Sequence, residues 1–247
     1  MESLLKVLFL VPLLAVRRMY HEATRRPWNP FVGCEHDCLY CRPSFQALTK
    51  RAGEVYGCEK CIRYEPHFHP ERLDKPLPRT GPNQFIFTCD CGDICFAKPE
   101  WVEAILARVK REPKRTFLIQ SKNPAFFQAF KWPPNVILAT TLETDREELT
   151  SQVSKAPPPV ERYKAMKALN HPRKIVTVEP IMDFNFETFT GWIMDINPLC
   201  TYIGYNSRSQ PRLPEPPRVK TLSLIKTLEA NNIPVRRKLI RKAWNET

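Results

Sequence analysis

The stretch that decides the fold lies near the amino terminus and reads Pro27-Trp28-Asn29-Pro30-Phe31-Val32-Gly33-Cys34-Glu35-His36-Asp37-Cys38-Leu39-Tyr40-Cys41. Its cysteines are spaced C-x3-C-x2-C, so their thiolates can bind three irons of a four-iron cluster and leave the fourth iron open. A closed structural cluster or a zinc site needs four protein ligands, and His36 is the one other plausible ligand in the stretch. The lack of a fourth cysteine in this stretch predicts a cluster that offers an open position to a substrate or cofactor.

Size and charge limit the class of protein. The chain has 247 residues, and its 43% of hydrophobic residues can form a substantial core, so we expect one large α/β domain over residues 19–247. The net charge of +12 attracts polyanions such as nucleic acid or phosphorylated substrates. Basic residues gather near the carboxyl terminus, where only Glu229 opposes them in sequence: Arg218, Lys220, Lys226, Arg236, Arg237, Lys238, Arg241 and Lys242. A binding face and an ordinary solvated face are both open interpretations.

The first 18 residues form a separate question. The run from residue 4 to residue 16 is almost wholly apolar but is shorter than the roughly 20 residues of a spanning helix. It also lacks the basic start and small-residue cleavage site of a signal peptide, so we expect no membrane association. Because Met19 stands just before the cysteine motif, residues 1–18 are either an upstream extension or an extra apolar helix or strand.

Cysteine usage indicates metal binding in a reducing compartment. Eight of the nine cysteines fall in the first 95 residues, in tight clusters, whereas Cys200 stands alone. A disulfide framework is expected in a shorter secreted chain. We therefore predict a cytoplasmic protein.

Alternating patterns predict the architecture. Short β-branched or aromatic runs at 85–89, 116–120, 136–141, 175–178, 202–205 and near 235 alternate with helical patterns that begin near residue 99 and cover 125–130, 160–169, 186–196 and 219–230. With one more strand before Cys34, about seven strands in βα order predict a partial or irregular TIM-type barrel. A flat doubly wound sheet is the alternative, but no G-x-G-x-x-G follows any strand. Residues 43–84 break the alternation and are interpreted as an insertion.

The cysteine stretch resembles a known superfamily. Cys34, Cys38, Tyr40 and Cys41 match the C-x3-C-x-aromatic-C signature of the radical S-adenosylmethionine (SAM) superfamily. The approach from Trp28 to Cys34 is similar to the branch of spore photoproduct lyase and its phage-associated relatives. Further segments resemble the phage-associated branch in the same order: Gly92-Asp93-Ile94, Pro99-Glu100-Trp101, Ser121-Lys122-Asn123-Pro124, Pro134-Asn135-Val136 and Val178-Glu179-Pro180.

The resemblance implies an activity and its partners. It implies a [4Fe–4S] cluster on Cys34, Cys38 and Cys41 whose open iron binds SAM, and reductive cleavage of SAM to a 5′-deoxyadenosyl radical that abstracts hydrogen from a substrate. An electron donor such as ferredoxin or flavodoxin is then needed. Together with the positive charge, the resemblance favours a nucleic-acid or nucleotide substrate, although a protein or a small metabolite fits the same core.

Single residues receive cofactor-binding roles from the same resemblance. Tyr40 would pack near the cluster and the adenine, and Gly92-Asp93 would form the turn that accepts hydrogen bonds from the SAM ammonium. Lys122, at a strand end, would neutralise the SAM carboxylate. Ribose hydroxyls would be bound by Glu143, with Thr141 as its competitor. Glu179 would either hold a carboxylate at the barrel mouth or form a structural pair with Arg162 or Arg173.

The remaining cysteines allow several interpretations. Cys58, Cys61, His67 and His69 offer four ligands within twelve residues and suit tetrahedral zinc. A second iron–sulfur cluster that combines Cys58 and Cys61 with Cys89, Cys91 or Cys95 is an alternative, and so are a disulfide and free thiols. Cys91 and Cys95, close to the proposed SAM turn, are candidate hydrogen-atom donors to a product radical. Cys89 and Cys200 fit buried core positions.

A second class of function competes with the enzyme. A non-catalytic protein, braced by an iron–sulfur cluster or zinc, could grip nucleic acid with its basic residues, and it would bind in a salt-sensitive way without turning over SAM. Polar residues of suitable charge at three successive strand ends, Asp93, Lys122 and Glu143, favour the enzyme.

Overall fold

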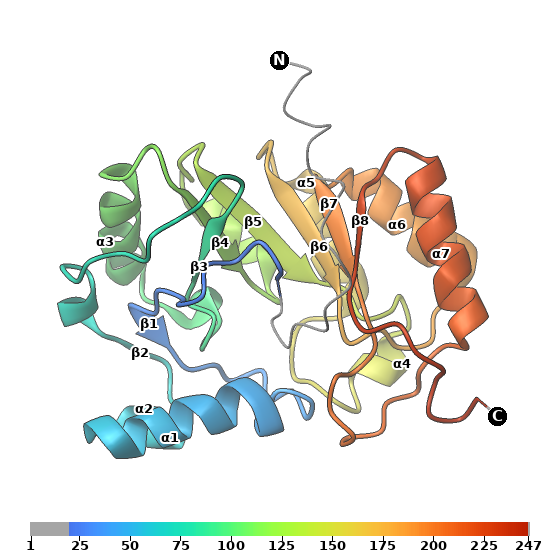
Figure 1. Ribbon diagram of the computed structural model, residues 1–247, viewed down its shortest axis with the longest axis horizontal. Coiled ribbons are helices and arrows are strands. Elements are labelled where there is room, and N and C mark those ends of the chain that lie inside the picture. The colour runs from blue at the N-terminus through green and yellow to red at the C-terminus, as the bar shows by residue number, and fades with distance from the viewer. Residues whose placement is uncertain (1–19, 247) are drawn as a thin grey trace.

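The computed structural model describes residues 20–246, so the apolar stretch expected at residues 1–18 lies outside the described residues. Six strands form one parallel sheet in chain order: β3 (Phe85–Thr88), β4 (Thr116–Gln120), β5 (Val136–Thr141), β6 (Lys174–Val178), β7 (Cys200–Ile203) and β8 (Val235–Arg237). The sheet curls into an open half-barrel, with α3 (Pro99–Lys110) at the end where the sheet begins and α6 (Phe186–Ile196) and α7 (Arg218–Ala230) at the other (Figure 1). The predicted partial TIM-type barrel is confirmed.

Helices cover the outer face of the sheet because their apolar residues recur at helical spacing. In α3, Pro99 occupies the first turn, where its missing N–H costs nothing, and Val102, Ile105, Leu106 and Val109 are buried on one side. They join outward-facing strand residues, α6 and α7 in one large core. Each fully buried side chain of this size stabilises the fold by about 1.5–3 kcal/mol. The helix α5 (Pro159–Ala168) completes this layer between β5 and β6.

The concave face of the sheet has its own smaller core. Successive strand residues point to opposite faces, so Phe85 and Phe87 face inward while Ile86 faces the helices. Tyr20 fills this inner face, with its ring centroid 5.1 Å from that of Phe87 and 4.7 Å from that of Tyr202. The described segment that leads into the cysteine stretch therefore packs, at Tyr20, inside the half-barrel.

The strand expected before Cys34 exists but does not extend the barrel. β1 (Phe31–Val32) pairs antiparallel with β2 (His67–Phe68) in a separate two-stranded sheet, so the barrel sheet has six strands instead of about seven. The main chain of residues 20–33 pairs with β3 and the turn after it through isolated bridges at Ala23, Trp28 and Gly33, without a continuous ladder. Pro27 and Pro30 lack the N–H groups that a continuous ladder requires, which explains the interruption.

Residues 43–84, interpreted above as an insertion, form short helices, one short strand and turns. They contain most of a π-helical turn (Arg42–Gln46), α1 (Ala47–Tyr56), α2 (Glu59–Arg63), β2 and a 3-10 turn (Pro70–Arg72). Further 3-10 turns lie at Ile94–Phe96 and at Pro124–Ala129, where a short helix was expected at 125–130. Three helices were not predicted: α1, α2 and the short α4 (Glu147–Thr150). Within the described residues, none of the helices has the length and apolar character needed to cross a membrane.

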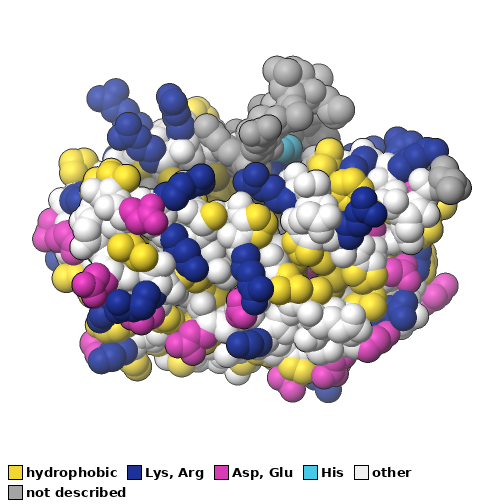
Figure 2. Space-filling view, turned by 90° about the horizontal axis from the view of Figure 1, so that it is seen from below, with side chains coloured by type: hydrophobic (Ala, Val, Ile, Leu, Met, Phe, Trp, Pro, Cys, Tyr) yellow, Lys and Arg dark blue, Asp and Glu magenta, His cyan; other side chains and the backbone are white. Residues whose placement is uncertain are grey.

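The basic residues near the carboxyl terminus do not form an unopposed face. Within the described residues at least five of the eight form ion pairs, and apart from Glu229 the acidic partners lie before residue 218: Lys220–Asp183, Arg236–Glu22, Arg237–Glu229, Lys238–Glu179 and Arg241–Glu215. Folding brings distant carboxylates to this region, which the linear sequence does not show. Figure 2 likewise shows basic and acidic side chains interspersed on the face that it displays.

Candidate functional site

Polar side chains continue the inward-facing positions of three strands beyond the carboxyl ends of those strands. Gln120 in β4 is followed two residues later by Lys122, Thr141 in β5 by Glu143, and the inward Thr177 in β6 by Glu179. Because residues two apart in an extended chain share a face, these three side chains reach the same rim of the half-barrel. This rim is where barrel enzymes hold their active sites. Thr141 itself accepts a hydrogen bond from Gln120 Nε2 at 2.6 Å.

Glu143 is the centre of a buried charge network. Its Oε2 accepts from Arg162 Nη1 at 2.7 Å, while its Oε1 accepts from both Lys122 Nζ and Tyr40 Oη. Lys122 Nζ also donates to Tyr40 Oη at 2.7 Å. Burial would raise the pKa of Glu143, but the charges of Arg162 and Lys122 outweigh it and hold that pKa well below its ordinary value. Both oxygens of this carboxylate are therefore engaged.

The network ties the cysteine stretch to the barrel. Tyr40 lies between Cys38 and Cys41, whereas Lys122 and Glu143 follow β4 and β5. Burial, followed by the nearby Cys38 thiol and the Glu143 carboxylate, raises the pKa of Tyr40 well above its ordinary value, so its hydroxyl remains a donor. Lys122 and Glu143 at the rim thus hold the cysteine stretch in position through Tyr40.

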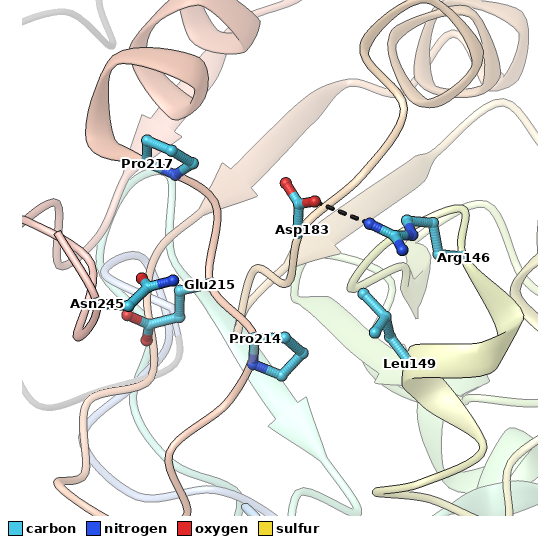
Figure 3. A pocket seen from close by; sticks show the side chains of 7 residues that line it. All are labelled: Arg146, Leu149, Asp183, Pro214, Glu215, Pro217 and Asn245. Carbon is cyan, nitrogen blue, oxygen red and sulfur yellow. Dashed lines mark hydrogen bonds and ion pairs between the residues drawn. The ribbon is translucent and has the colours of Figure 1, made fainter.

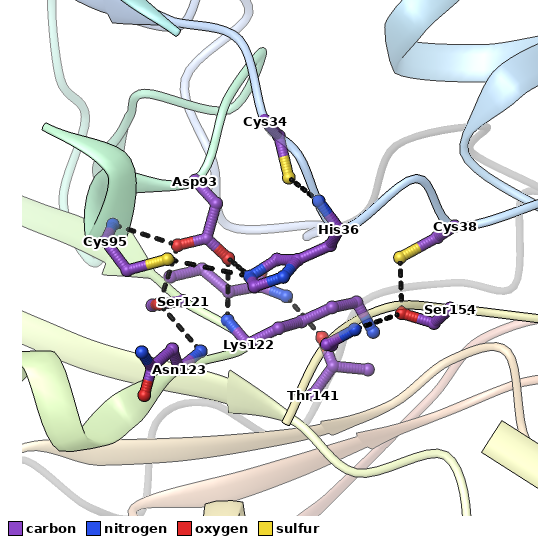
Figure 4. Close-up of polar contacts among 12 residues, drawn as sticks. Cys34, His36, Cys38, Asp93, Cys95, Ser121, Lys122, Asn123, Thr141 and Ser154 are labelled. Carbon is purple, nitrogen blue, oxygen red and sulfur yellow. Dashed lines mark hydrogen bonds and ion pairs between the residues drawn. The ribbon is translucent and has the colours of Figure 1, made fainter. Parts of the chain in front are cut away.

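Asp93 forms a second buried centre beside the cysteines (Figure 4). Its carboxylate accepts from Ser121 Oγ at 2.6 Å and from the Lys122 main-chain N–H at 2.8 Å. The Cys95 N–H and His36 Nε2 also approach it, each at 3.1 Å. Burial opposes ionisation, but the His36 contact and these hydrogen bonds lower the pKa of Asp93 below its ordinary value. All four acceptor positions of the carboxylate are engaged.

The three cysteines of the motif lie around this rim. Cys34 Sγ accepts from the His36 N–H at 3.4 Å, and Cys38 Sγ lies 3.1 Å from Ser154 Oγ (Figure 4). The main chain of the stretch is held by the segment after α4, since Leu39 N–H donates to Val153 O at 2.9 Å. Burial, and after it the neighbouring Cys38 thiol, raises the pKa of Cys41 to about 11. These two thiols are therefore close enough to affect one another.

Two glycines allow the cysteine stretch to lie against the turn after β3. Gly33 has a φ of 96° and donates its N–H to Cys91 O at 3.1 Å, while Asp93 N–H donates to Gly33 O at 3.1 Å. A Cβ atom at Gly92 would stand 2.8 Å from Gly33 N, and one at Gly33 would stand 2.1 Å from Glu65 O. Only glycine fits this approach of main chain to main chain.

Glu179 is placed at the barrel rim but its partner differs from the two structural partners considered. Arg162 is paired with Glu143, and Arg173 donates to Pro134 O, so neither contacts Glu179. The nearest cation is Lys238 Nζ, 3.9 Å from Glu179 Oε2, and that oxygen is buried without a hydrogen-bond partner. Burial, only partly offset by Lys238, raises the pKa of Glu179 to about 7. A proton acceptor poised near neutrality is typical of functional sites.

The cysteines and histidines outside the three-cysteine motif lie in several places. Cys95 Sγ lies 3.6 Å from His36 Nε2, beside Asp93, whereas Cys91 packs with Val32 and Cys61 under the insertion. A second group brings four possible ligand atoms within 4.8 Å of one another, from Cys58, Cys61, His67 and His69. All cysteines in the described residues have free thiols, and Cys200 is isolated at the start of β7.

A cavity of about 320 Å³ opens on the same rim, beyond β5 and β6. It is lined by Arg146, Leu149, Asp183, Pro214, Glu215, Pro217 and Asn245 (Figure 3). Arg146 Nη1 and Asp183 Oδ2 form an ion pair at 2.9 Å across it. The cavity therefore offers polar groups of both signs near the candidate site.

Four contributing residues were not assigned to the site from the sequence: Ser121, Ser154, Arg162 and Tyr64. Ser121 directly precedes Lys122 at a strand end, a position that signals the rim. Arg162 lies on the buried side of α5 with Ala165 and Met166, and an arginine at such a spacing signals a buried partner. Tyr64, whose hydroxyl lies near enough to the Cys41 thiol to influence its pKa, carries no comparable signal because the two residues are far apart in the sequence.

Comparison with known protein families gives a match that covers the candidate site. A family model described as "Protein of unknown function (DUF5131)" matches residues 20–185, which include the cysteine stretch, both buried centres and Glu179. No curated protein matches the chain by sequence.

Several solved structures share the fold. A radical SAM methyltransferase from Sphaerobacter thermophilus aligns with a TM-score of 0.55 at 14% identity, over 86% of this chain and 65% of that one. Streptococcus suis SuiB bound to S-adenosylmethionine aligns with a TM-score of 0.51 at 9% identity, over 86% of this chain and 50% of that one. The chain thus spans between half and two thirds of the length of these neighbours, and at such identities the likeness establishes the fold.

Proposed function

The chain belongs to the DUF5131 family, and from this premise and the geometry of the rim we propose that it is a radical SAM enzyme. The observation that carries the proposal is the link between the three-cysteine stretch and the rim, made by Tyr40, Lys122 and Glu143. Fold likeness to two radical SAM proteins supports it. Kinship with the spore photoproduct lyase branch and its phage-associated relatives belongs to the same proposal and rests on the sequence segments.

The donor set fits a [4Fe–4S] cluster. Cys34, Cys38 and Cys41 supply three thiols on one short stretch, and no fourth cysteine of that stretch closes the set. Such a cluster, when bound, supplies the electron that cleaves SAM to methionine and a 5′-deoxyadenosyl radical. The chain contributes the positions of the thiols through the contacts of Cys38 with Ser154 and of Cys41 with Tyr64.

The rim residues are proposed to bind SAM. Lys122 has two of its three N–H donors engaged by Glu143 and Tyr40, which leaves one for the SAM carboxylate. Because both oxygens of Glu143 are engaged, its primary contribution is to orient Lys122 and Tyr40, and a ribose hydroxyl would have to replace one of these donors. Thr141, which keeps its own hydroxyl hydrogen, is the other candidate for the ribose.

Asp93 and Glu179 complete the proposed cofactor site. The SAM ammonium would replace His36 Nε2 as a donor to Asp93, while Gly92 keeps the turn close to the cysteine stretch. Glu179 has an oxygen without a partner and can accept a proton or a hydrogen bond from a bound molecule. Cys95, beside His36 at the rim, is better placed than the buried Cys91 to return a hydrogen atom to a product radical.

The substrate is proposed at the level of a class. A nucleic acid or nucleotide agrees with the net charge of +12. The ion pairs of the carboxyl-terminal basic residues reduce the support for the competing idea of a non-catalytic, metal-braced nucleic-acid-binding protein. A ferredoxin or flavodoxin is the proposed electron donor, and the free thiols fit a cytoplasmic location.

Anaerobic reconstitution with iron and sulfide tests the proposal. The reconstituted protein should hold about four irons per chain and, after reduction, show an EPR signal that changes when SAM is added. The Cys34→Ala/Cys38→Ala/Cys41→Ala variant should lack this cluster, while the control Cys200→Ala should retain it. A reconstituted cluster whose EPR signal does not change when SAM is added would contradict the proposal.

A further inference from the structure

The insertion contains a group of donors separate from the three-cysteine stretch. Cys58, Cys61, His67 and His69 bring one ligand atom each within 4.8 Å of the others. We propose that these four side chains bind one Zn²⁺ ion in a closed, tetrahedral, structural site. The proposal goes beyond the proposed function and does not depend on SAM chemistry.

The distances agree with a tetrahedral zinc site. Zinc–sulfur bonds of about 2.3 Å and zinc–nitrogen bonds of about 2.0–2.1 Å at tetrahedral angles place sulfur and nitrogen about 3.5 Å apart. His67 Nε2 lies 3.5 Å from Cys58 Sγ and 3.4 Å from Cys61 Sγ, and His69 Nε2 lies 3.4 Å from Cys61 Sγ. Three independent contacts therefore have the spacing that a shared central ion imposes.

Hydrogen bonding assigns the protons of both imidazoles. His67 Nδ1 lies 2.7 Å from Glu65 O, which can only accept, so Nδ1 carries the hydrogen and Nε2 carries a lone pair. His69 Nδ1 lies 3.0 Å from Glu71 Oε1, which leads to the same tautomer. One lone pair on His67 Nε2 cannot satisfy two thiol donors at once, whereas a cation among them satisfies every ligand.

These outer contacts are typical of metal ligands. A ligating histidine commonly donates its second ring N–H to a main-chain carbonyl or a carboxylate, which orients the ring and strengthens its basicity. Glu65 O and Glu71 Oε1 supply these two acceptors here. The groups that contact the two imidazoles from outside therefore also suit a metal site.

Secondary structure explains the spacing of the ligands. Cys58 is the N-cap of α2, where its Sγ accepts from the Cys61 N–H at 3.4 Å, so the first turn of the helix brings both thiols to one side. His67 begins β2 and His69 follows it, and residues two apart in an extended segment point the same way. The His-x-His spacing thus suits a strand, while the longer spacing of many zinc sites suits a helix.

Two thiolates with two imidazoles are a typical donor set for zinc. A second iron–sulfur cluster would require more thiolates from the same place, and Cys95 instead lies beside His36. Cys91 packs near Cys61, but His67 and His69 already occupy the contact positions around the two thiols. The structure therefore favours zinc over the second cluster.

The proposed ion would hold the cysteine stretch in position through the ligand segments that contact it. β2 pairs with β1, with Val32 opposite His67, and His69 N–H donates to Pro30 O at 2.7 Å. Between the two ligand pairs, Glu65 O lies against Gly33, and the Tyr64 hydroxyl lies near enough to the Cys41 thiol to influence its pKa. The ligands thus fix a loop that contacts both ends of the three-cysteine motif.

Elemental analysis of the full chain purified without added metal tests the site. The wild type and the Cys34→Ala/Cys38→Ala/Cys41→Ala variant should both hold about one zinc per chain. His69→Ala and Cys58→Ser/Cys61→Ser should lose most of it, and the control Cys200→Ser should keep it. Zinc that persists in the triple variant separates this site from the proposed enzymatic cluster.

Cobalt substitution keeps the test valid if a ligand variant fails to fold. Wild-type protein in which Co²⁺ replaces zinc should show the intense visible absorption of tetrahedral cobalt together with thiolate charge-transfer bands. A folded wild type without zinc, zinc that is unchanged in His69→Ala, or an octahedral cobalt spectrum would overturn the proposal.

Discussion

Glu179 carries a carboxylate oxygen that is buried and has no hydrogen-bond partner, at the rim of the half-barrel. Its pKa is raised from 4.5 to about 7, chiefly by burial. Between these values the folded chain keeps a proton that the unfolded chain has released, so the free energy of unfolding decreases as pH rises through this window. Relative to the wild type, Glu179→Gln should gain about 3 kcal/mol of stability between pH 4.5 and pH 7.

Denaturant titrations at a series of pH values measure this difference. Glu103→Gln, at an exposed position of α3, is the matched control and should follow the wild-type profile. Parallel profiles for wild type and Glu179→Gln would show that this carboxylate titrates normally in the folded chain.

Lys122 is the one cation of the rim that is proposed to contact SAM directly. Its replacement by alanine removes a charge-assisted hydrogen bond worth about 1.5–3 kcal/mol, so SAM affinity should fall roughly 10- to 100-fold. The fold should persist, because Arg162 still neutralises Glu143. Equilibrium dialysis with the reconstituted protein measures the affinity, with Lys114→Ala as the control. Unchanged affinity in Lys122→Ala would remove Lys122 from the proposed site.

At this scale the sequence predicts some placements and not others. The positions of Lys122, Glu143 and Glu179 at one rim follow from the period of two along parallel strands. The engagement of both Glu143 oxygens could not be predicted, because Arg162 and Tyr40 approach it from distant segments. Long-range pairs of this kind depend on packing, which a single sequence does not reveal.

Among the elements, the turn after β3 and the cysteine stretch approach each other closely through main-chain atoms at Gly33 and Gly92. Gly92→Ala would place a Cβ 2.8 Å from Gly33 N and should destabilise the fold by about 1–3 kcal/mol. Iron uptake should fall with it, because the cysteine stretch must shift. Gly191→Ala is the control: its Cβ would meet nothing within 4 Å in α6, and alanine there should stabilise by about 0.5–1 kcal/mol.

Denaturation midpoints and iron content of the two alanine variants check this prediction. Equal stability of Gly92→Ala and the wild type would contradict the close approach described for this turn.

The barrel elements were predictable because each has a strong local pattern. The strands at 116–120 and 136–141 and the helix at 186–196 have the predicted bounds, since apolar periodicity and flanking turns agree there. β1 was expected in the barrel sheet, but its hydrogen-bonding partner β2 comes from the insertion, and pairing across such a distance has no local signal. The four-residue α4 was missed because one helical turn has too little periodicity to detect.

For the molecule as a whole, the ion pairs near the carboxyl terminus are predicted to stabilise the fold more than they attract nucleic acid. Arg241 donates to both oxygens of the buried Glu215 at 2.7 Å. Arg241→Ala would leave that carboxylate buried and unpaired, so the free energy of unfolding should fall by about 3–5 kcal/mol. Lys226→Ala, at an exposed position of α7, should change it little.

Denaturation measures the stability of both variants, and fluorescence anisotropy with a DNA duplex at several salt concentrations measures binding. Comparable stability of Arg241→Ala, together with a marked loss of DNA affinity, would favour the metal-braced nucleic-acid-binding protein over the enzyme.

The central claim is that the half-barrel and its three-cysteine stretch form a radical SAM enzyme. The most direct measurement is chromatography for 5′-deoxyadenosine after the reconstituted protein is reduced with dithionite and given SAM under anaerobic conditions. We predict that the wild type forms it and that Cys34→Ala/Cys38→Ala/Cys41→Ala does not. A wild type with a full iron and sulfide content that forms no 5′-deoxyadenosine, or a triple variant that forms as much, would contradict the claim.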